Sequence, residues 1–172
     1  MEGKELIKNG LGNSKRGTDR ALDGLTAEEL AWHPRPDANS IGLILLHMAR
    51  SEDSFVNSLI QGKPQLWETD KWYEKLNKSQ DDAGSHYTPE QVESFVVPEI
   101  TDLMAYTDAV RKQTLEFLED LTPEKLAQKV EVERQMPFEP VVGVLLMVVV
   151  THTAQHAGEI SYLRGLKRGM DK

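Results

Sequence analysis

Four segments of the chain carry apolar residues at every third or fourth position. They span residues 4–24, 41–61, 98–119 and 140–163. This spacing collects the apolar side chains on one face of an α-helix, and that face must be buried against other helices. The last segment begins with β-branched residues that also suit a strand, but its length and continuing helical spacing favour a helix. Four long amphipathic helices predict an all-α four-helix bundle.

A long connection, at about residues 62–97, separates the second and third of these segments. It shows little periodicity, yet it holds five of the chain's eleven aromatic residues, Trp67, Trp72, Tyr73, Tyr87 and Phe95. Connections of this length are uncommon in compact domains, and the aromatic residues argue against disorder. We therefore expect an ordered crossover that packs over one domain of residues 1–172, a length at which a single domain is the rule.

The chain has 172 residues and no cysteine. Any metal ion must therefore be held by His, Asp or Glu, and any thiol chemistry must take its sulfur from a substrate. The formal net charge is −8 and the basic residues are scattered, which argues against nucleic acid or an anionic membrane as a partner. No signal peptide is apparent, and the longest apolar run, residues 141–150, is too short to span a bilayer. We expect a cytoplasmic protein with a small-molecule substrate.

Two of the five histidines, His152 and His156, are four positions apart in the last helical segment. This spacing projects both imidazoles from the apolar face of one helix. Burying polar groups without partners is costly, and a shared metal ion would satisfy both imidazoles. His47 flanks the apolar face of the second segment and would meet the same site in an antiparallel bundle. Such a pair also arises by chance and lacks the internal Glu of the HExxH zinc motif, so structural histidines stay open beside a three-His metal site.

Several short motifs together resemble the DinB-like (YfiT-like) superfamily. They are Trp32-x-Pro34, Asn39-Ser40-Ile41-Gly42, residues 46–53 (LHMARSED), residues 84–92 (GSHYTPEQV), residues 106–110 (YTDAV) and residues 152–165 (HTAQHAGEISYLRG). The resemblance covers residues 20–166. It implies a four-helix bundle with a long crossover, a divalent metal bound by a His triad, and often a homodimer. His47, His152 and His156 stand at the triad positions.

The resemblance also implies an activity. Characterised relatives include thiol transferases that use bacillithiol or mycothiol, and a mycothiol-dependent maleylpyruvate isomerase. In the mycothiol-type relatives the position of His152 is often Asp, so the thiol stays open. Our leading hypothesis is a thiol transferase in which a divalent metal, zinc or nickel before iron or manganese, activates a low-molecular-weight thiol cosubstrate. The alternatives are a hydrolase that activates water at the metal and a non-catalytic bundle that binds a metal or a small molecule.

Other side chains in or near these motifs are candidates for supporting roles. Glu52 and Glu159 could act as a general base or orient an imidazole. The candidates for substrate binding are Arg50, Trp72, Tyr87, Tyr162 and Arg164. The ordinary alternatives are solvated carboxylates, surface ion pairs and aromatic packing in the core. His33 and His86 fall in connections, and we expect neither to bind the metal.

Overall fold

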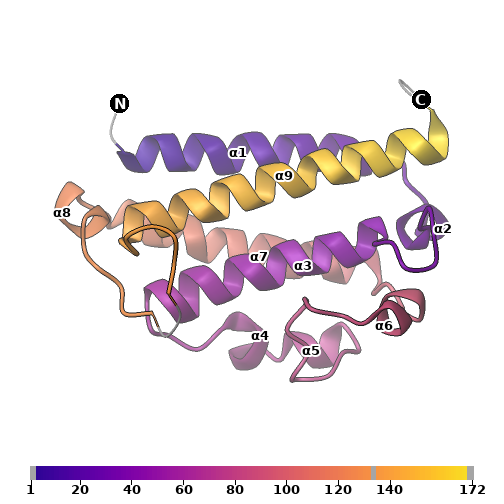
Figure 1. Cartoon of the computed structure of the whole chain (residues 1–172), viewed down its shortest axis with the longest axis horizontal. Coiled ribbons are helices and arrows are strands. Elements are labelled where there is room, and N and C mark those ends of the chain that lie inside the picture. Colours follow the sequence, from indigo (N-terminus) through magenta and orange to yellow (C-terminus); the bar gives the residue numbers. More distant parts are fainter. Residues whose placement is uncertain (1–2, 133–134, 170–172) are drawn as a thin grey trace.

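The computed structural model describes residues 3–132 and 135–169, and four long helices dominate it (Figure 1). They are α1 (Gly3–Leu22), α3 (Ile41–Asp53), α7 (Ile100–Glu119) and α9 (Val142–Arg168). A π-helical segment, η1 (Ser54–Ile60), continues α3. No β-strand occurs within the described residues, where one isolated bridge joins Lys129 to Val141. The all-α architecture expected from the sequence is therefore confirmed.

The long helices run in two parallel pairs, with α1 and α9 pointing one way and α3 and α7 pointing the other (Figure 1). The contact of α1 with α9 is close because Gly10 lies against Val150. A Cβ atom on Gly10 would stand 2.6 Å from Val150 Cγ1. Glycine inside a helix costs about 1 kcal/mol relative to alanine, and close helix packing offsets that cost here. α3 and α9 are antiparallel neighbours, as the placement of His47 requires.

Polar caps set the beginnings of several helices. Thr26 precedes α2 (Ala27–Ala31) and Thr88 precedes α6 (Pro89–Glu93), and each forms a capping box with the side chain three positions on, Glu29 and Gln91. Ser40 Oγ accepts the backbone N–H at the third helical position of α3, at 3.2 Å. A further short helix, α8, spans Pro123–Leu126 and follows a threonine cap as well. Each cap satisfies a backbone donor that the helix itself leaves unpaired.

The connection between η1 and α7 is ordered and begins at a buried carboxylate. It contains α6 and two further short helices, α4 (Leu66–Thr69) and α5 (Trp72–Lys75). The carboxylate of Asp53, with no exposed surface, accepts the backbone N–H groups of Leu66 at 3.0 Å and Trp67 at 2.9 Å. It also accepts the hydroxyl of Tyr106 at 2.7 Å. These donors make burial of the carboxylate tolerable and fix the crossover against α3 and α7.

The aromatic residues at the start of the crossover fill the core. The rings of Trp67 and Trp72 lie 5.6 Å and 5.4 Å from the ring of Tyr106, measured between centroids, and all three side chains are buried. Trp72 is therefore a core residue and does not line a substrate entrance, which corrects the expectation from the sequence. Among the described residues, no helix combines the length and apolarity needed to cross a membrane.

Candidate metal centre

Three imidazoles meet between α3 and α9. His47 comes from α3, and His152 and His156 come from successive turns of α9. The Nε2 atom of His152 lies 2.9 Å from that of His47 and 3.1 Å from that of His156. All three side chains are half-buried. Within the part of the chain that the structure describes, this is the one group of His, Asp and Glu side chains with the spacing of metal ligands.

Hydrogen bonds on the far side of two rings set the tautomer that a metal needs. His47 Nδ1 lies 2.8 Å from the carbonyl oxygen of Gly84, and His156 Nδ1 lies 2.7 Å from Glu159 Oε2. Both partners are acceptors, so each Nδ1 carries the proton and each Nε2 presents a lone pair toward the other rings. Hydrogen bonds of this kind hold metal-binding histidines in orientation. Glu159 therefore has the imidazole-orienting position expected of it.

The spacing of the three nitrogens fits a single cation. Nitrogen ligands about 2.0–2.1 Å from a zinc ion stand roughly 2.8–3.4 Å from one another in octahedral or tetrahedral geometry. The two Nε2–Nε2 distances of 2.9 Å and 3.1 Å lie within this range. The Nε2 lone pairs of His47 and His156 both face Nε2 of His152, and a single N–H there cannot donate fully to both. A cation between the three rings attracts the lone pair of each Nε2. Three neutral imidazoles are a donor set suited to zinc, nickel and iron.

Burial favours the neutral form of two of these imidazoles, His152 and His47. Burial and the nearby His156 and His47 together lower the pKa of His152 to about 4. Burial also lowers the pKa of His47 below its ordinary value of 6.5, although the hydrogen bond to Gly84 opposes this. A neutral imidazole is the form that binds a metal. His47 and His152 are therefore in the metal-binding form near neutral pH.

The triad lines a pocket of about 500 Å³. One part of the wall is apolar and contains Leu43, Ile44, Phe55 and Val92. The rest is polar, with Asn39, Ser51, Gly84, Ser85, His86 and Tyr87 beside the three histidines. The described lining residues include no Asp, Glu, Lys or Arg. A pocket of this size and character suits a small organic molecule with one end near the triad.

Arg50 holds the loop that contacts His47. Its guanidinium lies over the ring of Trp67, 4.2 Å from the centroid, and its Nε donates to the carbonyl oxygen of Asp82 at 3.1 Å. Gly84 packs so closely that a Cβ there would stand 2.7 Å from Arg50 Cβ, and its φ of +68° also favours glycine. Arg50 is thus a buried support of the loop and does not line the pocket, contrary to its expected role in substrate binding.

Glu52 also lies elsewhere than expected. It is buried and pairs with Arg111 of α7, which in turn donates to the carbonyl oxygen of Leu11 at 3.0 Å. Glu52 therefore joins α3 to α7, and no hydrogen bond links it to the triad. The sequence expectation of a general base or an imidazole partner at this position is corrected.

The remaining predicted residues divide between the pocket and other parts of α9. Tyr87 lines the pocket, and its hydroxyl donates to Asp82 Oδ1 at 2.6 Å. Arg164 donates to the carbonyl oxygens of Ala21 at 2.9 Å and Asp23 at 2.7 Å, so it ties α9 to the end of α1. Tyr162 is 66% exposed and is not among the pocket residues. Only Tyr87 of the five substrate-binding candidates is in the pocket.

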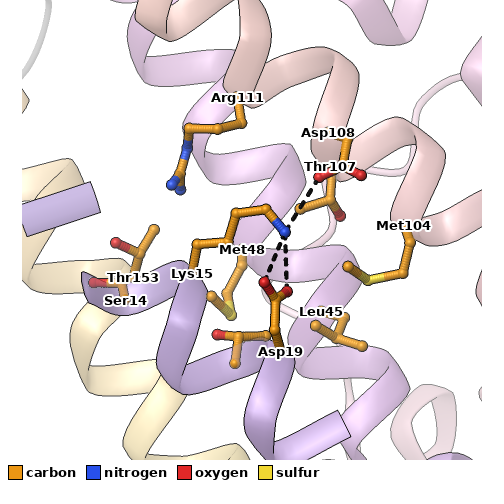
Figure 2. Close-up of a pocket in the computed structure, with 11 residues that line it drawn as sticks. Ser14, Lys15, Asp19, Leu45, Met48, Met104, Thr107, Asp108, Arg111 and Thr153 are labelled. Carbon is orange, nitrogen blue, oxygen red and sulfur yellow. Dashed lines mark hydrogen bonds and ion pairs between the residues drawn. The ribbon is translucent and has the colours of Figure 1, made fainter. Parts of the chain in front are cut away.

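A second cavity lies deeper in the bundle, beside α1, α3, α7 and α9. Figure 2 shows Lys15 across it, bonded to Asp19 and paired with Asp108. Its volume is about 30 Å³, roughly the space of a single water molecule. It is too small for an organic substrate. A pocket of about 530 Å³ lies between η1 and the chain around α8, but none of its described lining residues is a histidine. The pocket at the triad is the candidate site because three imidazoles converge on its wall.

Apart from Tyr87, sequence reasoning did not identify the residues of the loop at 82–87 as part of the site. Asp82 and Gly84 shape this loop, and His86 lines the pocket. The adjacent Gly84-Ser85-His86 suggests a turn. The loop contacts His47 through the carbonyl oxygen of Gly84 and is held there by Arg50. Both partners lie on α3, far from the loop in the sequence.

Known proteins support this architecture. A search of curated proteins gives no match. Among solved structures, a conserved protein from Enterococcus faecalis superposes with a TM-score of 0.83 at 25% identity, over 96% of this chain and 97% of that one. Residues 13–160 match the sequence family described as the DinB superfamily. Because this match covers most of the bundle and all three histidines, the chain belongs to the DinB superfamily.

Proposed function

We propose that the chain is a metalloenzyme that joins a low-molecular-weight thiol to an electrophilic substrate. The observation that carries the proposal is the convergence of three Nε2 atoms on the wall of a 500 Å³ pocket. Zinc and nickel are the first metal candidates, and iron and manganese follow. When bound, such a cation favours the thiolate form of a coordinating thiol, which is the nucleophilic form.

The protein's own groups have separate tasks in this reaction. Gly84 and Glu159 hold His47 and His156 in the ligating tautomer. The apolar wall, which includes Leu43 and Phe55, shields the nucleophile and the electrophile from water. A sulfur–carbon bond forms at the electrophile, the thiol proton passes to solvent, and any leaving group departs with its bonding electrons. Since the chain has no cysteine, no internal thiol competes for the metal.

The charges around the pocket favour a thiol over water as the nucleophile. Hydrolysis at a metal uses a general base to accept a proton from water. Glu52 is committed to Arg111 and Glu159 to His156, and the described residues that line the pocket include no carboxylate. A thiol loses its proton more readily than water does and needs less help from a base. This supports the transferase over the hydrolase.

A panel assay tests the proposal. Protein loaded with each candidate metal is mixed with cysteine, glutathione, bacillithiol or mycothiol and with monochlorobimane as the electrophile, and conjugate formation is followed by fluorescence. We expect at least one thiol to react faster than the uncatalysed rate, and we expect His152→Ala to abolish the difference. If the metal-loaded protein accelerates the reaction of no thiol, the chain is instead a non-catalytic metal-binding bundle. Such a bundle would show metal-dependent thermal stabilisation without turnover.

A further inference from the structure

His86 has an unusual backbone conformation at the edge of the pocket. Its φ is +60°, in the left-handed region that non-glycine residues seldom adopt. Glycine adopts this region freely, and asparagine, aspartate and histidine adopt it more often than other residues do. Strained positions persist where the surrounding structure enforces them, and they gather at functional sites.

Contacts on both sides of His86 enforce this conformation. Asp82 Oδ1 accepts the N–H of Gly84 at 2.8 Å and the hydroxyl of Tyr87 at 2.6 Å. The carbonyl oxygen of Gly84 accepts the proton of His47 Nδ1. The ring of Tyr87 packs edge-on against Phe95, at 5.7 Å between centroids. The loop is therefore fixed immediately before and after His86, and it is fixed to a metal ligand.

The side chain of His86 is left without a protein partner. It lines the same pocket as the triad, and it is exposed. It makes no hydrogen bond or ion pair with any residue in the described ranges, whereas the hydroxyl of Tyr87 is committed to Asp82. It is also outside the three-His group. Among the described lining residues, it is the one imidazole free to bond a molecule in the pocket.

We propose that His86 is a substrate-contacting residue that donates a hydrogen bond to a carboxylate of the bound thiol. This inference rests on the proposed thiol chemistry, and it narrows the cosubstrate to thiols that carry an acceptor group beyond the sulfur. No Lys or Arg among the described lining residues could bind such a group instead. His86 therefore selects among thiols, while the triad holds the metal.

Two thiol probes of equal chain length test this role. 3-Mercaptopropionate carries a carboxylate, and 1-propanethiol has a methyl group in its place. The protein is loaded with Co²⁺, whose visible absorption reports metal binding, and thiolate binding is followed by the sulfur-to-cobalt charge-transfer band. Glycine relieves a positive φ, so His86→Gly removes the imidazole without straining the loop. Asn77→Gly is the matched control, because Asn77 also has a positive φ, of 51°, and is not a pocket residue.

We expect His86→Gly to weaken the binding of 3-mercaptopropionate about tenfold, as for loss of a hydrogen bond to a charged group. The binding of 1-propanethiol should weaken less than about twofold. Cobalt affinity stays unchanged, and Asn77→Gly binds both probes as the wild type does. Equal affinity of His86→Gly and wild type for both probes overturns the inference, and so does an equal loss for both. Wild-type protein that gives no cobalt spectrum instead overturns the proposed function, and this inference falls with it.

Discussion

Glu52 on α3 accepts two hydrogen bonds from the guanidinium of Arg111 on α7, at 2.8 Å from Nε and 2.7 Å from Nη2. Both side chains are almost fully buried, at 5% and 11% exposure. The pair lies in the interior of the bundle and joins the helix that carries His47 to its parallel neighbour. Its role is therefore to hold α3 in place, and this role can be separated from metal binding by experiment.

Removing one partner of this pair should destabilise the fold without weakening metal binding. Arg111→Met leaves the Glu52 carboxylate buried and uncompensated, a change that costs about 3–5 kcal/mol. Lys112→Met, which removes an exposed pair with Glu116, should cost less than about 1 kcal/mol. Urea unfolding measures the stability of both variants. Metal titration of each folded variant checks that the metal affinity is unchanged. Equal effects of the two substitutions on unfolding would contradict the buried role.

Loss of one imidazole should abolish tight metal binding. His152 is the central ligand, since its Nε2 lies near those of both other histidines. We expect His152→Ala to lower metal affinity by more than about 100-fold, beyond the 10–100-fold typical of losing a ligand's hydrogen-bond partner. Circular dichroism should show an unchanged helix content. His33→Ala is the control, because His33 bonds only the nearby carbonyl of Ala38. Full metal occupancy in His152→Ala, measured by elemental analysis, would refute the triad.

The carbonyl of Gly84 should be needed for the orientation of His47. Gly84→Ala introduces a Cβ that collides with Arg50 and displaces the loop, so we expect a 10–100-fold loss of metal affinity. Gly62→Ala is the matched control, with a φ of +63° and nothing within 4 Å of the added Cβ. Both substitutions strain a positive φ and should lower stability, but calorimetry should find weaker metal binding only for Gly84→Ala. Similar metal affinities would show that this carbonyl is dispensable.

The metal-free protein should lose stability as the pH falls from about 6.5 to about 4. Burial lowers the pKa of His152 to about 4 and lowers that of His47 as well, whereas both titrate near 6.5 in the unfolded chain. Between these values the unfolded state binds more protons, so the free energy of unfolding falls with falling pH. Protonation of carboxylates adds to this loss of stability near pH 4. His152→Gln should therefore show a shallower dependence between pH 6.5 and 5; an identical slope in wild type and variant would rule out the contribution of His152.

The homodimer implied by the family resemblance stays a proposal, and α9 indicates where to test it. Four exposed apolar residues share one outward face of this helix: Val144, Met147, Tyr162 and Leu166. We expect Met147→Lys and Tyr162→Lys to shift sedimentation from dimer to monomer, because each places a charge in the interface. Leu6→Lys, on α1 and 56% exposed, should have no effect. A wild-type protein that sediments as a monomer at micromolar concentration would exclude this interface.

The helices and the triad could be predicted from the sequence because both depend on local spacing. The interval between His152 and His156 is about one turn once the segment is helical, and the apolar stripe through them indicated which way they point. His47 required one assumption, an antiparallel neighbour, which α3 and α9 satisfy. The π-helical turns of η1 were not foreseen, since the apolar pattern there suits an ordinary helix equally well.

Polar residues on buried helix faces were harder to interpret. Arg50 and Glu52 are neighbours of His47 in the sequence, yet their partners are Asp82 and Arg111, from other segments. Residue spacing shows that such groups face inward or flank the core, but it does not identify the partner across the bundle. Apart from Tyr87, the contribution of the loop at residues 82–87 was not predicted, for the same reason. Its conformation depends on a guanidinium and an imidazole that α3 supplies.

His47 and His152 stand 105 residues apart in the chain. A cation held by both would close a loop of that length, and so act as a reversible crosslink in a protein that can form no disulfide. Because such a cation binds the folded chain and leaves on unfolding, it adds stability through its binding, about 2.7 kcal/mol when the free metal is at roughly 100 times its Kd. Metal supply would then set the lifetime of the folded protein as well as its chemistry, and a cell that withdraws the metal would expose the chain to proteolysis.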